Sequence, residues 1–389
     1  MSTPDRATAR PHRRTVWQVI VATQLVLALL TAGGVVLLYR ALNDNIAPGE
    51  DIAHAPGVEK TPMSGTDAGD DQPMNILLMG SDSRAGAGND IDGLGDIGQR
   101  ADTTILLHVS ANRRNAYGVS LPRDAIIDRP DCKLRGGEIV PGASAVMFNT
   151  AFAVGGAQCA VQTVEALTGV FIDHFVVLDF NGFKAMVDAV DGVEVCIPKA
   201  VSDYEHNIFF DAGTQVLTGQ DALNYVRERY QLSVTGDIGR MKRQQAFIAS
   251  MTNKVLSAGT LSQPTKVYGF VDAVTSSIQV DSKLDSVGKL VRLALEFRNT
   301  GLAKIKFITV PVAEYEPDPN RLIWTSDADE LWQRINDDQQ LGKDFSADSI
   351  TAEDPVDPSE QPTTDPKDPQ DEQEQEQEAA DRAAAGLCA

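Results

Sequence analysis

The chain has 389 residues, of which 42% are hydrophobic, and its formal net charge is −21 at pH 7. That length allows one large domain or two small ones, each with a real hydrophobic core. So acidic a chain is a poor general binder of nucleic acid, because contacts to phosphates need a positive field. We therefore expect no nucleic-acid partner, and we expect any local basic cluster to hold a small, highly charged ligand.

The N-terminal segment is basic and then strongly apolar. Residues 1–14 contain four arginines and one acid, and the uncharged segment TVWQVIVATQLVLALLTAGGVVLLY follows directly. As a helix this segment is long enough to cross a bilayer, and the preceding arginines favour a cytoplasmic N-terminus. We predict a cytoplasmic tail over 1–14, a transmembrane helix over 15–40, and an extracytoplasmic remainder, as in a single-pass type II protein of the cell membrane. The alternative is a cleaved signal peptide.

Short apolar runs and helical stretches alternate after a linker over 41–73 that is rich in Pro, Gly, Asp and Thr. The predicted strands cover 74–83, 103–110, 116–122, 175–180, 192–197 and 305–312. The predicted helices cover 143–154, 158–168, 181–189, 219–226, 238–257 and 283–297. Near-continuous apolar strands that alternate with helices are typical of a layered α/β domain. We predict one α/β/α domain over 74–340, with a central and mostly buried sheet.

The C-terminal segment and the cysteines complete the outline. From residue 344 onward, 14 acids face two basic residues, so we predict an acidic disordered tail over 341–389. Four cysteines allow three disulfide pairings, which persist in an oxidising compartment. We favour Cys132 with Cys159, because they lie in a loop and a helical stretch that are close in sequence. Buried free thiols are the alternative.

Polar side chains stand at three ends of predicted strands, where α/β proteins place their sites. In chain order they are Asp82, Arg84, Arg100, Asp102, Arg123 and Asp124. Asp82 and Asp102 have the chemistry to hold Mg²⁺, which prefers one or two carboxylates, water and phosphate oxygens. Taken alone, each aspartate is more often a turn or helix-cap residue.

A second basic cluster lies in YVRERYQLSVTGDIGRMKRQQ, residues 225–245. Arg227 and Arg229 are two residues apart and point to the same side of an extended segment. Asp237 is a plausible N-cap of the helix that follows. That helix is predicted to place further polar side chains on one face: Arg240, Arg243 and Gln244. One guanidinium group can donate two parallel hydrogen bonds to phosphate oxygens, so the cluster suits a pyrophosphate. A solvated face paired with acids is an equal alternative.

Taken together, these segments resemble the LytR–CpsA–Psr family of bacterial cell-wall ligases. The matching segments run in the family's order over about 74–257 and are NILLMGSDSR, RADTTILLHV, GVSLPRDAII, MFNTAFAVGG, IDHFVVLDFNGF, AVDGVEVCIP, GQDALNYVRERY and GDIGRMKRQQ. Residues 311–335 resemble the C-terminal part of actinobacterial members. The chain departs from the family pattern in RADT, where many members have RSDT, and in a glycine-rich insertion between Asp82 and Asp102.

The resemblance implies a membrane-anchored enzyme that uses Mg²⁺ to transfer a glycopolymer from a polyprenyl-pyrophosphate carrier to peptidoglycan. The metal-binding aspartates of the family match Asp82 and Asp102. Its pyrophosphate-binding arginines, which we assign to catalysis, match Arg100, Arg123, Arg227, Arg229 and Arg240. By position, we assign substrate binding to Arg84, Arg243 and Gln244.

The expected reaction is attack of a peptidoglycan hydroxyl on the sugar-linked phosphorus, with polyprenyl phosphate leaving and Asp102 or Asp124 as the general base. One alternative is a pyrophosphatase that uses the same site with water as the acceptor. Another is a non-enzymatic, membrane-anchored regulator of wall synthesis that binds the lipid without turnover. The residues leave the identity of the glycopolymer open, and also whether the acceptor is peptidoglycan or a protein.

Overall fold

The structure is a computed structural model that describes residues 12–60, 72–82, 99–229, 231–233, 235–297, 300–346, 349–353, 379–380 and 382–388. The chain forms two units, Met1–Asn45 and Ile46–Ala389, each described here by itself. The first unit consists of helix α1 (His12–Asn45), which is apolar and long enough to cross a membrane. A membrane anchor and a signal sequence share this property.

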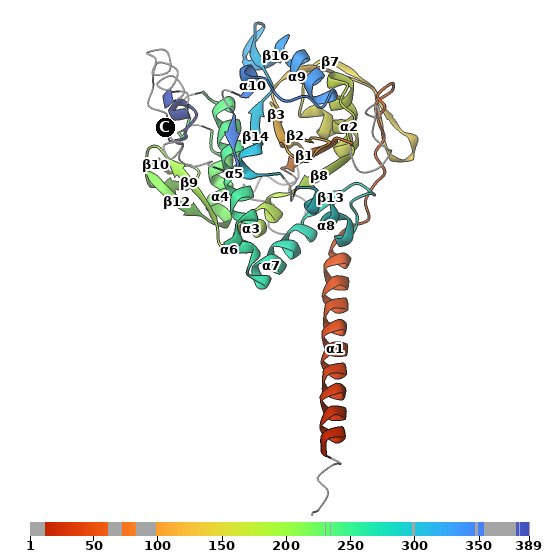
Figure 1. Ribbon diagram of the computed structural model, residues 1–389. Coiled ribbons are helices and arrows are strands. Elements are labelled where there is room, and N and C mark those ends of the chain that lie inside the picture. The colour runs from red at the N-terminus through yellow and green to blue at the C-terminus, as the bar shows by residue number, and fades with distance from the viewer. Residues whose placement is uncertain are drawn as a thin grey trace, which may run out of the picture. The chain divides into compact units, whose positions relative to one another are not determined.

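The second unit is built around a seven-stranded mixed sheet with the strand order β13–β8–β1–β2–β3–β14–β17 (Figure 1). Its strands are β1 (Met74–Ser81), β2 (Ala101–Val109), β3 (Ala116–Leu121), β8 (His174–Leu178), β13 (Ile278–Val280), β14 (Ile305–Thr309) and β17 (Ile350–Thr351). β1 pairs with β8, and β3 with β14, in parallel, and the other neighbours are antiparallel. Five of the predicted strands are therefore confirmed within this sheet.

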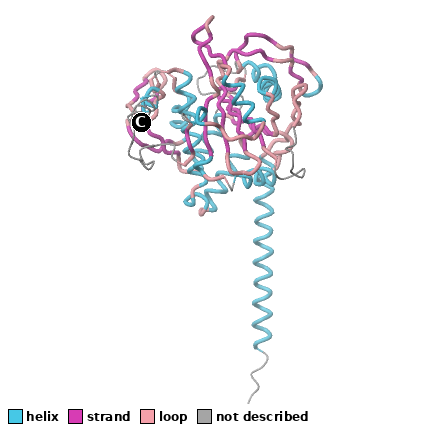
Figure 2. Tube along the Cα trace, turned by 45° about the horizontal axis from the view of Figure 1, so that its top comes forward, coloured by secondary structure: helices cyan, strands magenta, loops and turns pink. Residues whose placement is uncertain are grey.

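Helices cover both faces of the sheet (Figures 1 and 2). α2 (Thr150–Thr168) and α9 (Asp327–Asn336) share one hydrophobic cluster with the sheet, and α5 (Asp237–Leu256) contributes to another. In β14, Ile308 belongs to the first cluster and Phe307 to the second, since successive side chains of a strand point to opposite faces. The predicted α/β/α layering with a buried sheet is confirmed.

A smaller lobe forms beside the sheet from the sixth predicted strand and its neighbours. It comprises α3 (Phe180–Ala189), β9 (Val193–Ile197), β10 (Val201–Asp203), β11 (Ile208–Phe210), β12 (Gly213–Leu217) and α4 (Gly219–Arg227). β9 pairs with β12 in a separate two-stranded sheet. Tyr225 of α4 and Phe247 of α5 are buried in the core of this lobe, so α5 contributes to both parts. The end of α4 and the start of α5 therefore lie between the two parts.

The remaining elements are short or lie at the periphery. They are β4 (Ile126–Arg129), β5 (Cys132–Lys133), η1 (Arg135–Gly137), β6 (Ile139–Val140), β7 (Ala143–Met147), α6 (Ala258–Leu261), α7 (Pro264–Thr275), α8 (Val287–Glu296), η3 (Leu302–Lys304), β15 (Val312–Tyr315), β16 (Asp318–Trp324) and α10 (Lys343–Ser346). The predicted helix over 143–154 is wrong for residues 143–147, which pair with β4 as a strand, and it is confirmed for residues 150–154, which begin α2. A short apolar run suits a strand as well as a buried helix, and here cross-strand pairing decides the outcome.

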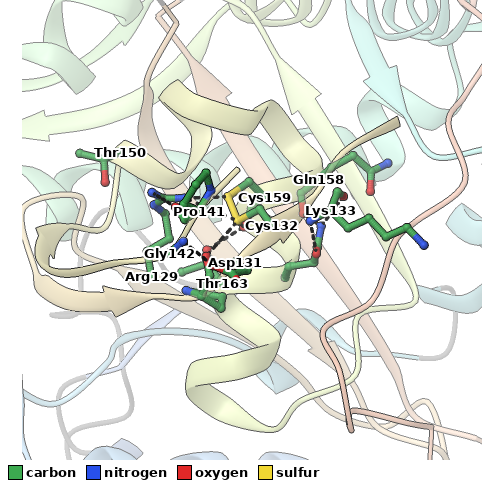
Figure 3. The surroundings of a disulfide bond; sticks show 12 residues. Arg129, Asp131, Cys132, Lys133, Pro141, Gly142, Thr150, Gln158, Cys159 and Thr163 are labelled. Carbon is green, nitrogen blue, oxygen red and sulfur yellow. Dashed lines mark hydrogen bonds between the residues drawn. A yellow bond between two sulfur atoms is a disulfide. The ribbon is translucent and has the colours of Figure 1, made fainter. Parts of the chain in front are cut away.

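The predicted disulfide between Cys132 and Cys159 is confirmed, and it ties β5 to α2 (Figure 3). The neighbouring Arg129 is buried and donates from Nη2 to the carbonyl oxygen of Pro141, 2.8 Å away. On α2, Gln162 donates to the carbonyl oxygen of Lys133 and accepts from its N–H, at 2.9 Å in both bonds. The disulfide and the two hydrogen bonds of Gln162 together hold β5 against α2.

Replacing Cys132 and Cys159 together by serine is expected to lower the free energy of unfolding by about 2–4 kcal/mol. The two cysteines are 27 residues apart, and the bond restricts that length of chain in the unfolded state. Denaturant unfolding of the variant and the wild type measures the difference. Reducing the wild type should reproduce at least this loss, whereas a double variant within about 0.5 kcal/mol of the wild type would contradict the expectation.

Part of the predicted linker is packed onto the second unit. The main-chain N–H of Ala55 and the Nδ1 of His54 both bind the fully buried carboxylate of Glu165 on α2, at 2.7 Å each. Farther along, Lys60 Nζ lies 2.5 Å from Asp173 Oδ1. His54, Ala55 and Lys60 of the predicted linker over 41–73 are therefore held on the domain, by contacts with partners about 110 residues away in sequence.

The predicted disordered tail over 341–389 is also wrong for parts of its length. β17 joins the edge of the central sheet, and Leu387 is buried in the cluster that contains α5. Cys388 forms a disulfide with Cys196 on β9. The acidic composition is an average over residues 341–389. Such an average does not reveal the short apolar stretch that ends in Leu387 and Cys388.

Candidate active site

Strand pairing brings the three predicted polar strand ends to one edge of the central sheet. β1 and β3 both run antiparallel to β2, so the end of β1, the start of β2 and the end of β3 coincide. Just beyond β1, the N–H of Asp82 donates to the carbonyl oxygen of Arg100 at 2.9 Å. Asp82 Oδ1 accepts a 2.5 Å bond from the N–H of Arg100. The side chain of Arg100 is exposed, and Arg84 lies outside the described residues.

Arg123, two residues after β3, lies among three carboxylates. Its Nη1 donates to Asp102 Oδ1 at 2.5 Å, and its Nε is 3.4 Å from Asp124 Oδ2 and 3.6 Å from Asp237 Oδ1. Burial by itself lowers the pKa of Arg123, but Asp102, Asp237 and Asp124 outweigh it and raise the pKa. This side chain therefore connects the edge of the sheet to the start of α5 and stays charged at any physiological pH.

Arg240 is almost completely buried one turn into α5. Its Nη2 lies 2.6 Å from Asp237 Oδ1, and Asp237 is the first residue of the helix, with Gly236 rather than Asp237 at the N-cap. Burial lowers the pKa of Arg240 to about 10; Asp237 opposes this shift, and the like charges of Arg123 and Arg229 add to it. Arg240 is still protonated at neutral pH, but its charge is only partly compensated by the protein.

Arg227 and Arg229 come from the end of α4 and the extended residues after it. Arg229 Nη2 is 4.0 Å from Asp102 Oδ1, and the Cζ of Arg227 is 4.7 Å from the ring centroid of Phe180. Burial would raise the pKa of Asp102, but Arg123, Arg240 and Arg229 together lower it. Arg123, Arg229 and Arg240 therefore act on one carboxylate, and the catalytic roles assigned to them and to Arg227 stay predictions.

Several buried polar atoms of this cluster lack hydrogen-bond partners within the described part of the chain. They are the Nε atoms of Arg123 and Arg240 and the Oδ2 atom of Asp237. A buried donor or acceptor without a partner costs about 1–3 kcal/mol. Unsatisfied groups of both signs are expected at a site that binds a ligand carrying both negative oxygens and a positive ion.

Arg243 is not grouped with the other arginines. Its guanidinium is fully buried; Nη1 donates to the carbonyl oxygen of Ala385 at 3.2 Å, and Nη2 donates to that of Glu228. We therefore correct its assignment to substrate binding, because its donors are directed at the main chain. Gln244 is also buried and donates from Nε2 to the carbonyl oxygen of Val226 at 3.1 Å, and its role in substrate binding stays a prediction.

Two charged residues of the cluster were not assigned a role from the sequence. The sequence indicates Asp237 only as a helix cap, and Arg321 on β16 belongs to no recognisable motif. Arg321 Nη1 is 3.7 Å from Asp124 Oδ1, and its Nε is 3.6 Å from Asp318 Oδ2. The bridge between Ala125 and Leu322 brings β16 to this position. A pairing about 200 residues apart has no local sequence signal, so Arg321 was not predictable.

Asp82 and Asp102 provide a donor set that fits Mg²⁺. Over the described ranges, no group of three or more His, Cys, Asp or Glu residues that could hold a metal ion occurs. Mg²⁺ does not need such a group, since it is often held by one or two carboxylates together with water and phosphate oxygens. The lowered pKa of Asp102 keeps its carboxylate ionised. These two residues suit a metal that is completed by a phosphate ligand.

The fold and this cluster define an α/β domain with buried arginines and carboxylates grouped at one edge of its sheet. The chain belongs to the LytR_cpsA_psr family, whose model matches residues 44–339. It is 33% identical to the cell wall biosynthesis protein LcpA of Corynebacterium glutamicum, over 77% of this chain and 61% of that protein. The chain therefore spans only about six-tenths of that relative.

Other similarities agree with this family. The polyisoprenyl-teichoic acid–peptidoglycan teichoic acid transferase TagU of Oceanobacillus iheyensis is 30% identical, over 80% of this chain and 89% of that protein. The crystal structure of protein gbs0355 from Streptococcus agalactiae matches with a TM-score of 0.57 and 26% identity, over 70% of this chain and 90% of that one. The LytR-Csp2A-Psr enzyme from Actinomyces oris has the same fold, with a TM-score of 0.54, 20% identity, and coverage of 75% and 97%.

Proposed function

We propose that this protein transfers a glycopolymer from a polyprenyl-pyrophosphate carrier to a hydroxyl group of peptidoglycan. The observation that carries the proposal is the convergence of Arg123, Arg229 and Arg240 on Asp102, with buried donors that no described residue satisfies. A pyrophosphate provides closely spaced oxygens for such guanidinium groups. The similarity to a transferase that is named for polyisoprenyl-linked teichoic acid and peptidoglycan supports this class of substrate and acceptor.

In the proposed reaction the acceptor hydroxyl attacks the phosphorus that carries the sugar, and polyprenyl phosphate leaves with the bridging oxygen. Arg123, Arg229 and Arg240 bind the phosphoryl oxygens and stabilise the negative charge that develops on them and on the leaving group. Mg²⁺, which we propose is held by Asp82 and Asp102, supplies further neutralisation of this charge when bound. The arginines also hold the two phosphoryl groups in a fixed orientation towards the acceptor.

The acceptor hydroxyl must lose its proton during the attack. A general base works best when its pKa is near the working pH, and the pKa of Asp102 is lowered by its arginine neighbours. This favours Asp102 as a metal ligand rather than as the base. Asp124, which lies 3.4 Å from Arg123 and 3.7 Å from Arg321, is the base that we propose.

We further propose that α1 is a membrane anchor and that the second unit acts outside the cytoplasm. The carrier lipid stays in the membrane, so an anchored enzyme works where its substrate is concentrated. The apolar helix at residues 14–45 and the basic residues before it support this orientation.

The test compares transfer with its two rivals in one assay. The full-length protein is incubated with a polyprenyl-pyrophosphate-linked oligosaccharide and Mg²⁺, with and without peptidoglycan fragments. A ligase forms a product only with fragments present, and a pyrophosphatase releases polyprenyl phosphate equally without them. Binding without turnover in either arm would identify a regulator and overturn the proposal.

Removing Mg²⁺ with EDTA is expected to abolish transfer. Replacing Asp82 or Asp102 by asparagine is expected to raise the Mg²⁺ concentration for half-maximal activity by about 10- to 100-fold, because each loses a charged ligand. A matched control is Asp285→Asn, which changes an exposed carboxylate that pairs with Lys289 on the surface. Unchanged Mg²⁺ dependence in both site variants would contradict the metal assignment.

A further inference from the structure

The C-terminal segment 382–388 is fixed onto the part of the chain that carries the site arginines (Figure 1). Cys388 is bonded to Cys196 of β9, and Leu387 is buried against Ala246 and Ala249 of α5. At the other end of the segment, Arg382 Nε donates to the carbonyl oxygen of Cys388 at 3.0 Å. A covalent bond, an apolar anchor and an internal hydrogen bond therefore hold seven residues in one place.

Arg243 connects this segment to the residues between α4 and α5. One of its terminal nitrogens donates to the carbonyl oxygen of Ala385, and the other donates to that of Glu228. Glu228 lies between Arg227 and Arg229, two predicted catalytic residues, so the second hydrogen bond holds the peptide that links Glu228 to Arg229. The guanidinium therefore lies behind the arginine pair and is bonded to its main chain.

Glu228 and the C-terminal segment also make close contacts that do not involve Arg243. The Glu228 carboxylate accepts from the N–H groups of Gln231 and Leu232, at 2.9 Å each. Gly386 has φ = +80°, and a Cβ on it would lie 2.1 Å from the carbonyl oxygen of Leu232. Only glycine fits this position, because both its backbone conformation and the neighbouring carbonyl exclude a side chain.

We propose that Arg243 is a positioning residue for the transfer reaction. It holds the peptide of Glu228 against the disulfide-anchored C-terminal segment, and thereby fixes the places of Arg227 and Arg229. The inference rests on the proposed function for the identity of the anion, whereas the link between the two segments rests on the structure alone. Through Arg243, the segment 382–388 thus helps to fix the positions of two arginines of the site.

A role in packing alone does not account for an arginine here. Burial lowers the pKa of Arg243, with Tyr225 and Glu228 opposing the shift, so the charged group is kept at a cost. An apolar side chain fills a buried volume without that cost. The property that arginine adds is a rigid, planar set of donors that reaches two carbonyl oxygens at once.

The principal test is the kinetics of Arg243→Met and Arg243→Lys in the full-length protein. Assays at least about 15 °C below each variant's Tm, normalised to folded protein, should show kcat/KM lowered about 10- to 100-fold in the methionine variant, because small misplacements of binding groups have effects of this size. Lysine keeps the charge and one donor, so it should restore part of the loss. Wild-type kcat/KM in Arg243→Met would overturn the proposal.

Arg113→Met is the matched control. Arg113 is also largely buried, donates to the carbonyl oxygens of Ser110 and Ala111, and pairs with Glu296 at 2.6 Å. Its loss should lower the Tm and leave kcat/KM within about twofold, because it supports a different part of the fold. An equal fall of kcat/KM in both variants would show a general structural effect and would overturn the positioning role.

A second readout does not depend on the reaction. Hydrogen exchange at the amides of Gln231 and Leu232 should accelerate in Arg243→Met and in Gly386→Ala, and should stay unchanged in Arg113→Met. If the wild type transfers no glycopolymer but exchange is accelerated in Arg243→Met and in Gly386→Ala, the proposed function fails and the structural link stands. Unchanged exchange in both Arg243→Met and Gly386→Ala would overturn the link.

Discussion

Replacing Arg123 by alanine is expected to lower kcat for glycopolymer transfer by about 10²- to 10³-fold. The guanidinium group of Arg123 lies against Asp102, Asp124 and Asp237, so its loss removes a phosphate ligand and leaves three carboxylates facing one another. Both effects weaken binding of an anionic transition state. Initial rates with a polyprenyl-pyrophosphate-linked oligosaccharide and peptidoglycan fragments measure the loss.

Arg123→Lys separates charge from geometry. Lysine restores one positive charge but not the planar fork, so its rate should fall between those of the alanine variant and the wild type. The Arg113→Met variant, which loses a buried ion pair elsewhere, should transfer at the wild-type rate. A rate for Arg123→Ala within threefold of the wild type would show that this side chain has no part in the reaction.

The same substitution should move the acid limb of the pH–rate profile. Asp102 has a lowered pKa, partly through Arg123, so its ionisation contributes stability that is lost only as pH falls through that lowered value. Without Arg123 the pKa of Asp102 rises towards its ordinary value, because the effect of burial is then opposed only by Arg240 and Arg229. Activity that requires ionised Asp102 should therefore begin to fall at a higher pH in Arg123→Ala than in the wild type.

The central part of the site was predictable because sheet geometry follows from local patterns. Apolar runs in the sequence indicate β1, β2 and β3, and polar residues stand directly at the ends of these runs. Antiparallel pairing then places Asp82, Asp102 and Arg123 at one edge of the sheet without further information. Arg229 and Arg240 join them because α4 and α5 are strongly patterned helices with clear ends.

Other parts were not predictable because they depend on contacts between distant residues. Arg321 reaches Asp124 only through the bridge of β16 to Ala125, and no local pattern encodes that pairing. Arg243 has the same helical spacing as a ligand-binding arginine, and its burial against the C-terminal segment decides its role. The acidic composition beyond residue 341 hid this segment, since a few buried residues scarcely change an average.

The double variant Arg240→Met/Asp237→Asn is expected to lose at least about 100-fold in transfer while unfolding no more easily than the wild type. Arg240 is buried, and its pKa is lowered to about 10 by burial and by the charges of Arg123 and Arg229. Replacing a buried ion pair by apolar residues of similar volume is often neutral or stabilising by about 1–4 kcal/mol, and methionine with asparagine likewise removes both charges at similar volume. Activity assays and denaturant unfolding of the same samples measure both quantities.

The double variant tests whether Arg240 and Asp237 serve the stability of the fold or the binding of a ligand. The control is Lys289→Met/Asp285→Asn, an exposed pair one helical turn apart, which should change stability by less than about 1 kcal/mol and leave transfer intact. A double variant of the site that unfolds more easily by over about 3 kcal/mol would assign the pair to the fold. Unchanged or increased stability with lost transfer means that the protein keeps the partly compensated charge of Arg240 on α5 because an anionic ligand pairs with it.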